Sequence, residues 1–127
     1  MQMNNLFAIA LGGSLGALAR YGVDALVATL LGRGFPYGTL LINVTGSFAI
    51  GIMYVLIIEH MEMHPIWRHV LIVGFLGAYT TFSTFSLESV RLLEQGQMLS
   101  AGLYVLSSVA ICLCATWLGL VVARGSL

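Results

Sequence analysis

Four long apolar segments, separated by short polar breaks, are the feature of this sequence that most limits its fold. They run from about residues 5–31, 37–58, 66–93 and 98–123. A helix of about 20 residues crosses the hydrocarbon core of a bilayer, and lipid offers no partner to backbone groups left unpaired. The sequence therefore predicts an all-α membrane protein with four transmembrane helices in a single domain, residues 1–127.

Composition agrees with this prediction and excludes several classes of function. The chain is 59% hydrophobic and only 8% charged, whereas soluble domains are about 25% charged. It has no basic stripe of the kind that binds nucleic acid, and no Ser-His-Asp arrangement, phosphate loop or cofactor motif, so we expect no enzyme. Ala17-Leu18-Ala19 is compatible with a signal-peptide cleavage site, but the apolar pattern continues to Leu31 and no basic residue precedes it. We expect no cleavage.

The arginines bear on orientation, since the chain has five of them and no lysine. An even number of spans places both termini on one side, with Arg68 and Arg124; Arg33 and Arg91 fall on the other side, and Arg20 lies within the first span. Orientation follows an excess of Lys and Arg in cytoplasmic loops. The near balance predicts insertion in both directions and pairing with an inverted copy, although one or two charges could still decide a single orientation.

Pairs of small residues favour close helix crossings. Gly12 and Gly16 form a Gly-x-x-x-Gly pair, and Ser47 with Gly51 forms a looser one. Such pairs let two helix backbones approach. The contact is either within one chain or between two copies.

The cysteines and histidines give no metal site. Cys112 and Cys114 point about 200° apart on a helix, so they form neither a local disulfide nor a metal pair, and we interpret them as small core residues. The three histidines, at positions 60, 64 and 69, fall in and beside one loop without a ligand spacing.

The middle of the third segment, GFLGAYTTFSTFSLE, is unlike an ordinary membrane helix. In helical arithmetic Thr80, Ser83 and Thr84 share a face about 100° wide, while Phe82 and Phe85 lie opposite, within about 60°. A hydroxyl can donate to an anion, and an aromatic ring has a positive edge. The stretch therefore predicts a path that replaces part of an ion's hydration. The alternative is that the hydroxyls bond back to their own helix and the rings pack.

Within this stretch, residues 77–81 are the most favourable place for the third helix to break. Carbonyl oxygens freed by a break coordinate Na⁺ in broken transporter helices. Asn43, deep in the second span, either bonds across helices or marks a pathway. Tyr104 and Ser108, four apart in the fourth span, share a face and would extend a polar route.

Charged residues near the span ends suggest a vestibule. Arg20 and Asp24 form either an i,i+4 pair near the membrane interface or part of a vestibule that attracts anions. Glu88, one turn beyond Phe85 and Thr84, is expected near a pore mouth.

Three motifs give a family resemblance over essentially the full length: GGSLGALARY, GTLLINVTGSF and GFLGAYTTFSTFSLE. The chain resembles the CrcB/Fluc fluoride channel family. The resemblance implies an antiparallel, dual-topology homodimer in the inner membrane, with two pores through which F⁻ leaves the cytoplasm passively.

The resemblance also implies roles for individual residues. Phe82 and Phe85 would line the pores, and Asn43 would order the aromatic path. Carbonyls of Gly77 and Thr80 from both subunits would hold a structural Na⁺. The remaining matches are Ser83, Thr84 and Tyr104 in a polar track and Arg20 at the entrance. Ala78 departs from the family pattern, because many members have a second glycine there, and this matters if the position needs a positive φ.

The rival hypothesis is a proton-coupled exporter of small cations, like the small multidrug-resistance proteins. Those proteins need a carboxylate buried in mid-membrane, whereas the acids of this chain lie toward span ends or loops: Asp24, Glu59, Glu62, Glu88 and Glu94. A membrane scaffold without transport would leave the cluster of hydroxyls unexplained.

Overall fold

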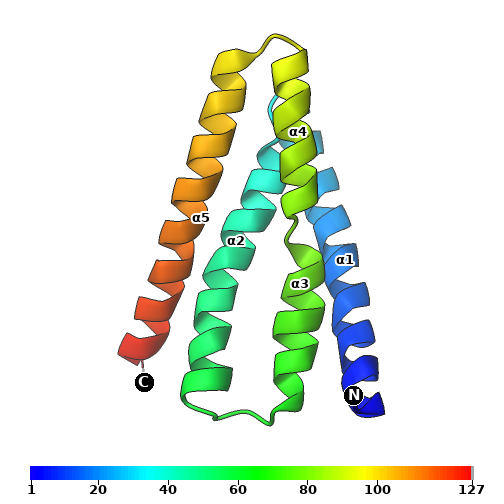
Figure 1. Ribbon diagram of the computed structural model, residues 1–127, viewed down its shortest axis with the longest axis vertical. Helices are drawn as coiled ribbons and strands as arrows, with labels where there is room; N and C mark the ends of the chain where they lie inside the picture. The colour runs from blue at the N-terminus through cyan, green and yellow to red at the C-terminus, as the bar shows by residue number, and fades with distance from the viewer. Residues whose placement is uncertain (127) are drawn as a thin grey trace.

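The computed structural model describes residues 1–126, and every regular element within them is a helix (Figure 1). Four helices are long and apolar enough to cross a membrane: Met3–Leu31, Tyr37–Glu59, Arg68–Glu94 and Met98–Gly125. This confirms the predicted all-α architecture with four spans. Both chain ends lie at the same end of the bundle (Figure 1).

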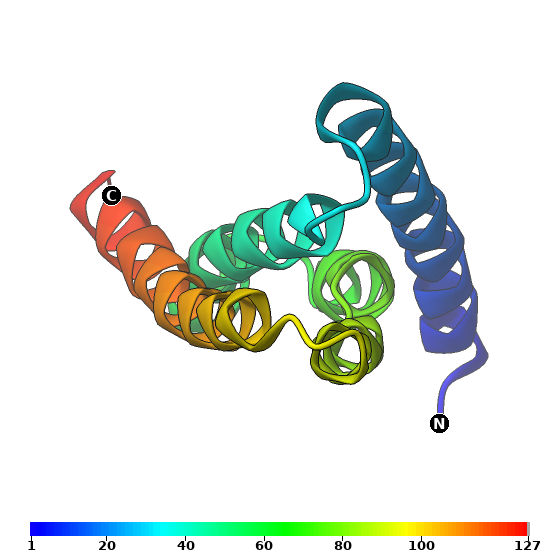
Figure 2. The ribbon, with the colours of Figure 1, turned by 90° about the horizontal axis from the view of Figure 1, so that it is seen from above.

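The spans are built from seven helical segments, two of them π-helical. In chain order they are α1 (Met3–Leu31), α2 (Tyr37–Tyr54), the π-helical η1 (Val55–Glu59) and η2 (Arg68–Leu76), α3 (Gly77–Tyr79), α4 (Phe82–Glu94) and α5 (Met98–Ser126). Seen from above, α1 and α5 lie at the two outer edges, with α2 and the third span between them (Figure 2). The turns after α1 and α4 contain Gly32 and Gly96 with φ of 74° and 75°, which glycine adopts without steric cost.

Two extended residues separate α3 from α4. Thr80 has φ −78° and ψ 157°, and Thr81 has φ −152° and ψ 112°. Ala78 lies inside α3, and Met61 is the one non-glycine residue with positive φ in the described chain. Position 78 therefore does not require glycine, and alanine suits its helical backbone.

The glycine pair of α1 packs within the chain. A Cβ added at Gly12 would overlap the carbonyl oxygen of Val70, and one at Gly16 would overlap that of Phe75. Both carbonyls belong to η2, so these glycines allow α1 to lie directly on the third span. Gly51 and Gly119 perform the same function where α2 crosses α5, each facing backbone of the other helix.

The best-buried residues lie on α2, η1 and α5, and the main cluster of buried side chains joins α4 to α5. Tyr104, Ile42 and Val55 are the largest fully buried side chains, and a cluster around Tyr104 includes Phe85 and two further residues, Leu92 and Ala101. Most other large apolar side chains are exposed, as expected for surfaces that face lipid or another subunit.

The interpretation of both cysteines as core residues is wrong. Cys114 is exposed and Cys112 is only partly buried, and both are free thiols. The fourth span packs against α2 through small residues such as Gly119 instead. The cysteine side chains are not part of that contact.

The glycine contacts predict a large difference between two similar substitutions in α1. Gly16→Ala forces a Cβ into the η2 backbone, and we expect a loss of about 1–3 kcal/mol of unfolding free energy, as for overpacked cores. Gly22→Ala is the matched control, because no atom lies within 4 Å of its added Cβ. Apparent melting temperatures in detergent would separate the two variants; equal values would contradict this account of the α1 packing.

Candidate functional site

Asn43 on α2 pairs with the backbone of the gap between α3 and α4. Its Oδ1 accepts the N–H of Thr81 at 2.8 Å, and its Nδ2 donates to the carbonyl of Thr81 at 3.0 Å. One amide side chain therefore satisfies both backbone polar groups of the extended residue Thr81. In lipid each of these groups would cost several kcal/mol if it were unpaired. Of the two expectations for Asn43, the cross-helix bond is confirmed.

Thr81 also begins α4. Its Oγ1 caps the helix by accepting the N–H of Thr84 at 3.2 Å, as hydroxyl residues commonly do at this position. The same oxygen donates to Thr84 Oγ1 at 2.9 Å and lies 3.4 Å from Ser83 Oγ. Three hydroxyls therefore gather at the start of α4, while Ser83 and Thr84 remain exposed.

The predicted face shared by Thr80, Ser83 and Thr84 is only partly right. It assumed a continuous helix, but the extended residues interrupt the 100° step between Thr80 and α4. The Thr80 hydroxyl donates back to the carbonyl of Leu76 at 2.9 Å. Thr81, which sequence reasoning missed, replaces it in the hydroxyl cluster; its signal was a threonine three residues before Thr84, at cap spacing.

The same bonds change the partners of two carbonyl groups. In a continuous helix the N–H of Thr81 would donate to Gly77 and that of Thr84 to Thr80. These N–H groups instead donate to Asn43 Oδ1 and Thr81 Oγ1. The carbonyls of Gly77 and Thr80 are thereby released from those helical bonds.

The two phenylalanines of α4 are in contact but differ in exposure. Their ring centroids are 5.4 Å apart, with Phe82 78% exposed and Phe85 9% exposed. Phe85 also contacts Tyr104, at 5.2 Å between centroids. Both phenylalanines line a cavity of about 430 Å³, together with Asn43, Thr80, Thr81 and Ser108.

Tyr104 and Ser108 supply hydroxyls that lack a protein partner. They are 0% and 6% exposed, and neither hydroxyl makes a hydrogen bond within the described residues. Burying an unpaired hydroxyl costs free energy, so a pair of them one turn apart on α5 is a signal of function more than of packing.

A second cavity, of about 590 Å³, opens toward the other end of α4. Its charged lining residues are Arg20, Asp24, Arg33, Glu88 and Arg91. We call this cavity the vestibule. Thr81 lines both it and the 430 Å³ cavity, and Thr84 lines the vestibule alone, so Thr81 is the member of the hydroxyl cluster that lies between the two.

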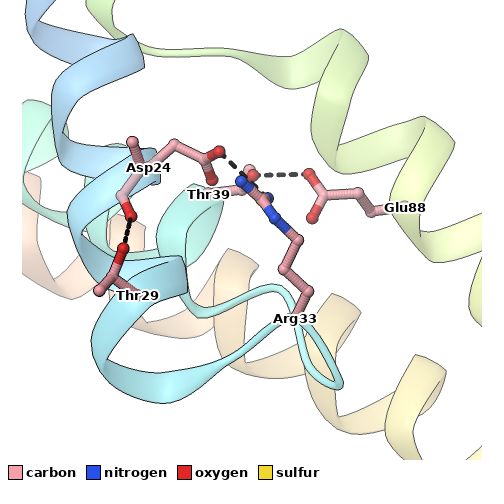
Figure 3. Close-up of polar contacts among 6 residues, drawn as sticks. Asp24, Thr29, Arg33, Thr39 and Glu88 are labelled. Carbon is pink, nitrogen blue, oxygen red and sulfur yellow. Dashed lines mark hydrogen bonds and ion pairs between the residues drawn. The ribbon is translucent and has the colours of Figure 1, made fainter.

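Two contacts at the vestibule differ from those expected from the sequence. Asp24 pairs with Arg33 of the following loop at 3.3 Å, not with Arg20 (Figure 3). Glu88 accepts a hydrogen bond of 2.5 Å from Thr39 at the start of α2 (Figure 3). Thr39 was missed, although its position four residues before Asn43 puts both on one face of α2.

Metal ligation by acidic, cysteine or histidine side chains finds no support. No group of three or more such side chains lies together anywhere in residues 1–126.

Known proteins resemble the chain closely. Residues 7–120 match the family of CrcB-like proteins, described as camphor resistance. A Methylococcus capsulatus protein named fluoride-specific ion channel FluC is 55% identical over 120 residues, covering 94% of this chain and 53% of the relative, so the chain spans about half of its length. A Coxiella burnetii protein of the same name is 46% identical over 94% of this chain and 98% of its own. A third, from Acidobacterium capsulatum, is 53% identical over 91% and 93%.

The two hydrogen bonds between Asn43 and Thr81 predict that Asn43→Leu lowers the stability of the protein markedly. The leucine leaves the N–H and carbonyl of Thr81 without their partner, and we expect a loss of about 1–3 kcal/mol for each unsatisfied group. Thermal unfolding in detergent measures the loss. Ser14→Ala is the control, since the Ser14 hydroxyl is exposed and only bonds back to its own helix; equal effects would argue against a structural role for the pair.

Proposed function

The chain belongs to the CrcB family of fluoride channels, and we propose that it lets F⁻ leave the cytoplasm passively along the hydroxyls and rings at the start of α4. The observation that carries this proposal is the position of that cluster. Thr81 lines both the vestibule and the cavity lined by Phe82 and Phe85, and Thr84 lines the vestibule. The hydroxyls of Thr84 and Ser83 lie 2.9 and 3.4 Å from Thr81 Oγ1.

Small, strongly hydrated F⁻ needs replacements for its water. Ser83 and Thr84 present exposed hydroxyls that can donate to an anion, and the edges of Phe82 and Phe85 carry positive partial charge. Ser108 adds a buried hydroxyl without a protein partner on the same cavity. Together they stabilise an anion without a full positive charge in the membrane, which would itself be costly.

The vestibule would gather anions before they enter. Three arginines, at positions 20, 33 and 91, outnumber its two carboxylates, and a cleft lined mainly by one sign of charge concentrates ions of the opposite sign. The pair of Asp24 with Arg33 and the bond from Thr39 to Glu88 keep both carboxylates engaged at the rim.

We further propose that two chains pair antiparallel in the inner membrane and form two equivalent pores. Support comes from the arginines, which divide almost evenly between the two ends of the bundle, and from Phe82, which is 78% exposed beside an open cavity. A second subunit would cover this ring, and twofold symmetry gives each subunit the same surroundings.

A structural Na⁺ would fit between the two chains. The carbonyls of Gly77 and Thr80 are released from their helical bonds, and Gly77 is exposed. Carbonyl oxygens of broken membrane helices suit a hard cation, and two copies would supply twice as many donors. The ion would neutralise the carbonyl dipoles and hold the two broken spans together.

Transport of this kind needs no energy source. HF enters from acidic surroundings and dissociates in a neutral cytoplasm, and the trapped F⁻ leaves down its electrochemical gradient. The relatives are named as channels, so neither an enzyme nor the proton-coupled cation exporter is favoured.

Fluoride efflux from proteoliposomes tests the proposal. We expect release of F⁻ and not Cl⁻, without a proton gradient, because only a small anion fits hydroxyl donors and ring edges. Phe82→Ile removes the ring and should reduce F⁻ release to that of protein-free vesicles.

Phe7→Ile is the matched control for this variant, because Phe7 on α1 is also largely exposed, at 69%, but lines neither cavity. It should leave release intact. Uptake of organic cations driven by a pH gradient would instead support the cation exporter.

Sodium should stabilise the dimer even in the absence of fluoride. If Na⁺ binds only the folded protein, a concentration 100 times its Kd adds about 2.7 kcal/mol to stability. The apparent melting temperature should therefore rise when Na⁺ replaces N-methylglucammonium, with K⁺ as the size control. Identical melting curves in all three cations would refute the Na⁺ site.

A further inference from the structure

Cys112 lies in the row of side chains that α5 presents to the 430 Å³ cavity. Tyr104, Ser108 and Cys112 follow one another at steps of four, the spacing at which helix residues share a face. Ser108 and Cys112 both line the cavity, along with Phe82, Phe85 and Asn43. The thiol is free and partly exposed.

Ser108 is a second, independent observation that points to the binding of a polar species at this face of α5. Its side chain is 94% buried, since 6% is exposed, and its hydroxyl has no hydrogen-bond partner in the described chain. A buried hydroxyl is normally paired, and Ser108 lines the cavity, so we take its unpaired hydroxyl as a donor that is free for a polar guest of the cavity. Whatever reaches Ser108 passes within one helical turn of the thiol.

We propose that Cys112 is a modification site inside the fluoride pathway, at which a small thiol-reactive electrophile blocks conduction. The inference rests on the proposed function, because it takes this cavity as part of the route of F⁻. It gives the channel a chemical sensitivity that the hydroxyls of the same row do not have.

The chemistry requires only the thiol and the reagent. Cys112 loses its proton to water, and the thiolate attacks the sulfenyl sulfur of a methanethiosulfonate. A disulfide forms as the sulfur–sulfonyl bond breaks, and methanesulfinate leaves with the electron pair. With the sulfonatoethyl reagent, the product carries a fixed negative charge next to the path of an anion.

That charge should act strongly on F⁻. Like charges repel far more in a partly dehydrated cavity than in water, and the added group also fills space beside Ser108. A fluoride ion would meet both obstacles at the point where its hydration has already been reduced.

Cys114 provides a control within the same helix. It is exposed but does not line the cavity, because two residues rotate a helix by about 200°. The reagent can react with it without entering the cavity.

The test labels purified wild type, Cys112→Ser and Cys114→Ser with sulfonatoethyl methanethiosulfonate in detergent, followed by reconstitution. Mass spectrometry locates the adducts, and F⁻ efflux is compared with that of the same untreated variant. We expect labelling to reduce efflux about tenfold or more in wild type and Cys114→Ser, with recovery in dithiothreitol, and to have no effect in Cys112→Ser.

Three results would overturn the proposal: no adduct at Cys112, an adduct there with unchanged efflux, or equal inhibition of Cys112→Ser. Cys112→Ala repeats the test if the serine variant does not fold. Absence of efflux from untreated wild type would refute the proposed function instead, and the mass of the Cys112 peptide would still decide whether the thiol is reachable.

Discussion

The two hydrogen bonds between Asn43 and Thr81 make the rest of the third span possible. A membrane helix cannot stop and restart in lipid unless the freed backbone groups find partners. Asn43 supplies an acceptor and a donor to one residue at 2.8 and 3.0 Å. With Thr81 held in this way, α4 can begin a new helix whose first hydroxyls need not all serve its own backbone.

This arrangement exchanges local stability for exposed polar groups. The Thr81 side chain caps α4, yet Ser83 and Thr84 stay exposed, and the hydroxyls of Tyr104 and Ser108 are buried without partners. Each unpaired buried group lowers the stability of the folded protein, and a bundle with a purely structural role gains nothing in return. A channel benefits from them, because donors already in position can replace ion hydration without a rearrangement.

The fold is closely packed on one side of this site and open on the other. Glycines bring α1 against η2 and α2 against α5 at backbone contact, and close packing of this kind holds the broken span in position. Phe82, by contrast, is 78% exposed while its neighbour Phe85 is buried against Tyr104. Half of the aromatic pair thus belongs to the core of one chain, and the other half faces outward.

The sequence by itself determined the four apolar spans, the membrane as solvent and the concentration of hydroxyls and rings in the third span, because hydropathy and residue type are local properties. Helical arithmetic also put Tyr104 and Ser108 on one face. Only the tertiary structure decided that Thr81 replaces Thr80 in the hydroxyl cluster, that Asp24 pairs with Arg33, and that Thr39 binds Glu88. These contacts depend on where the helix stops and on which loop folds over it, and both follow from long-range packing that a periodic pattern does not contain.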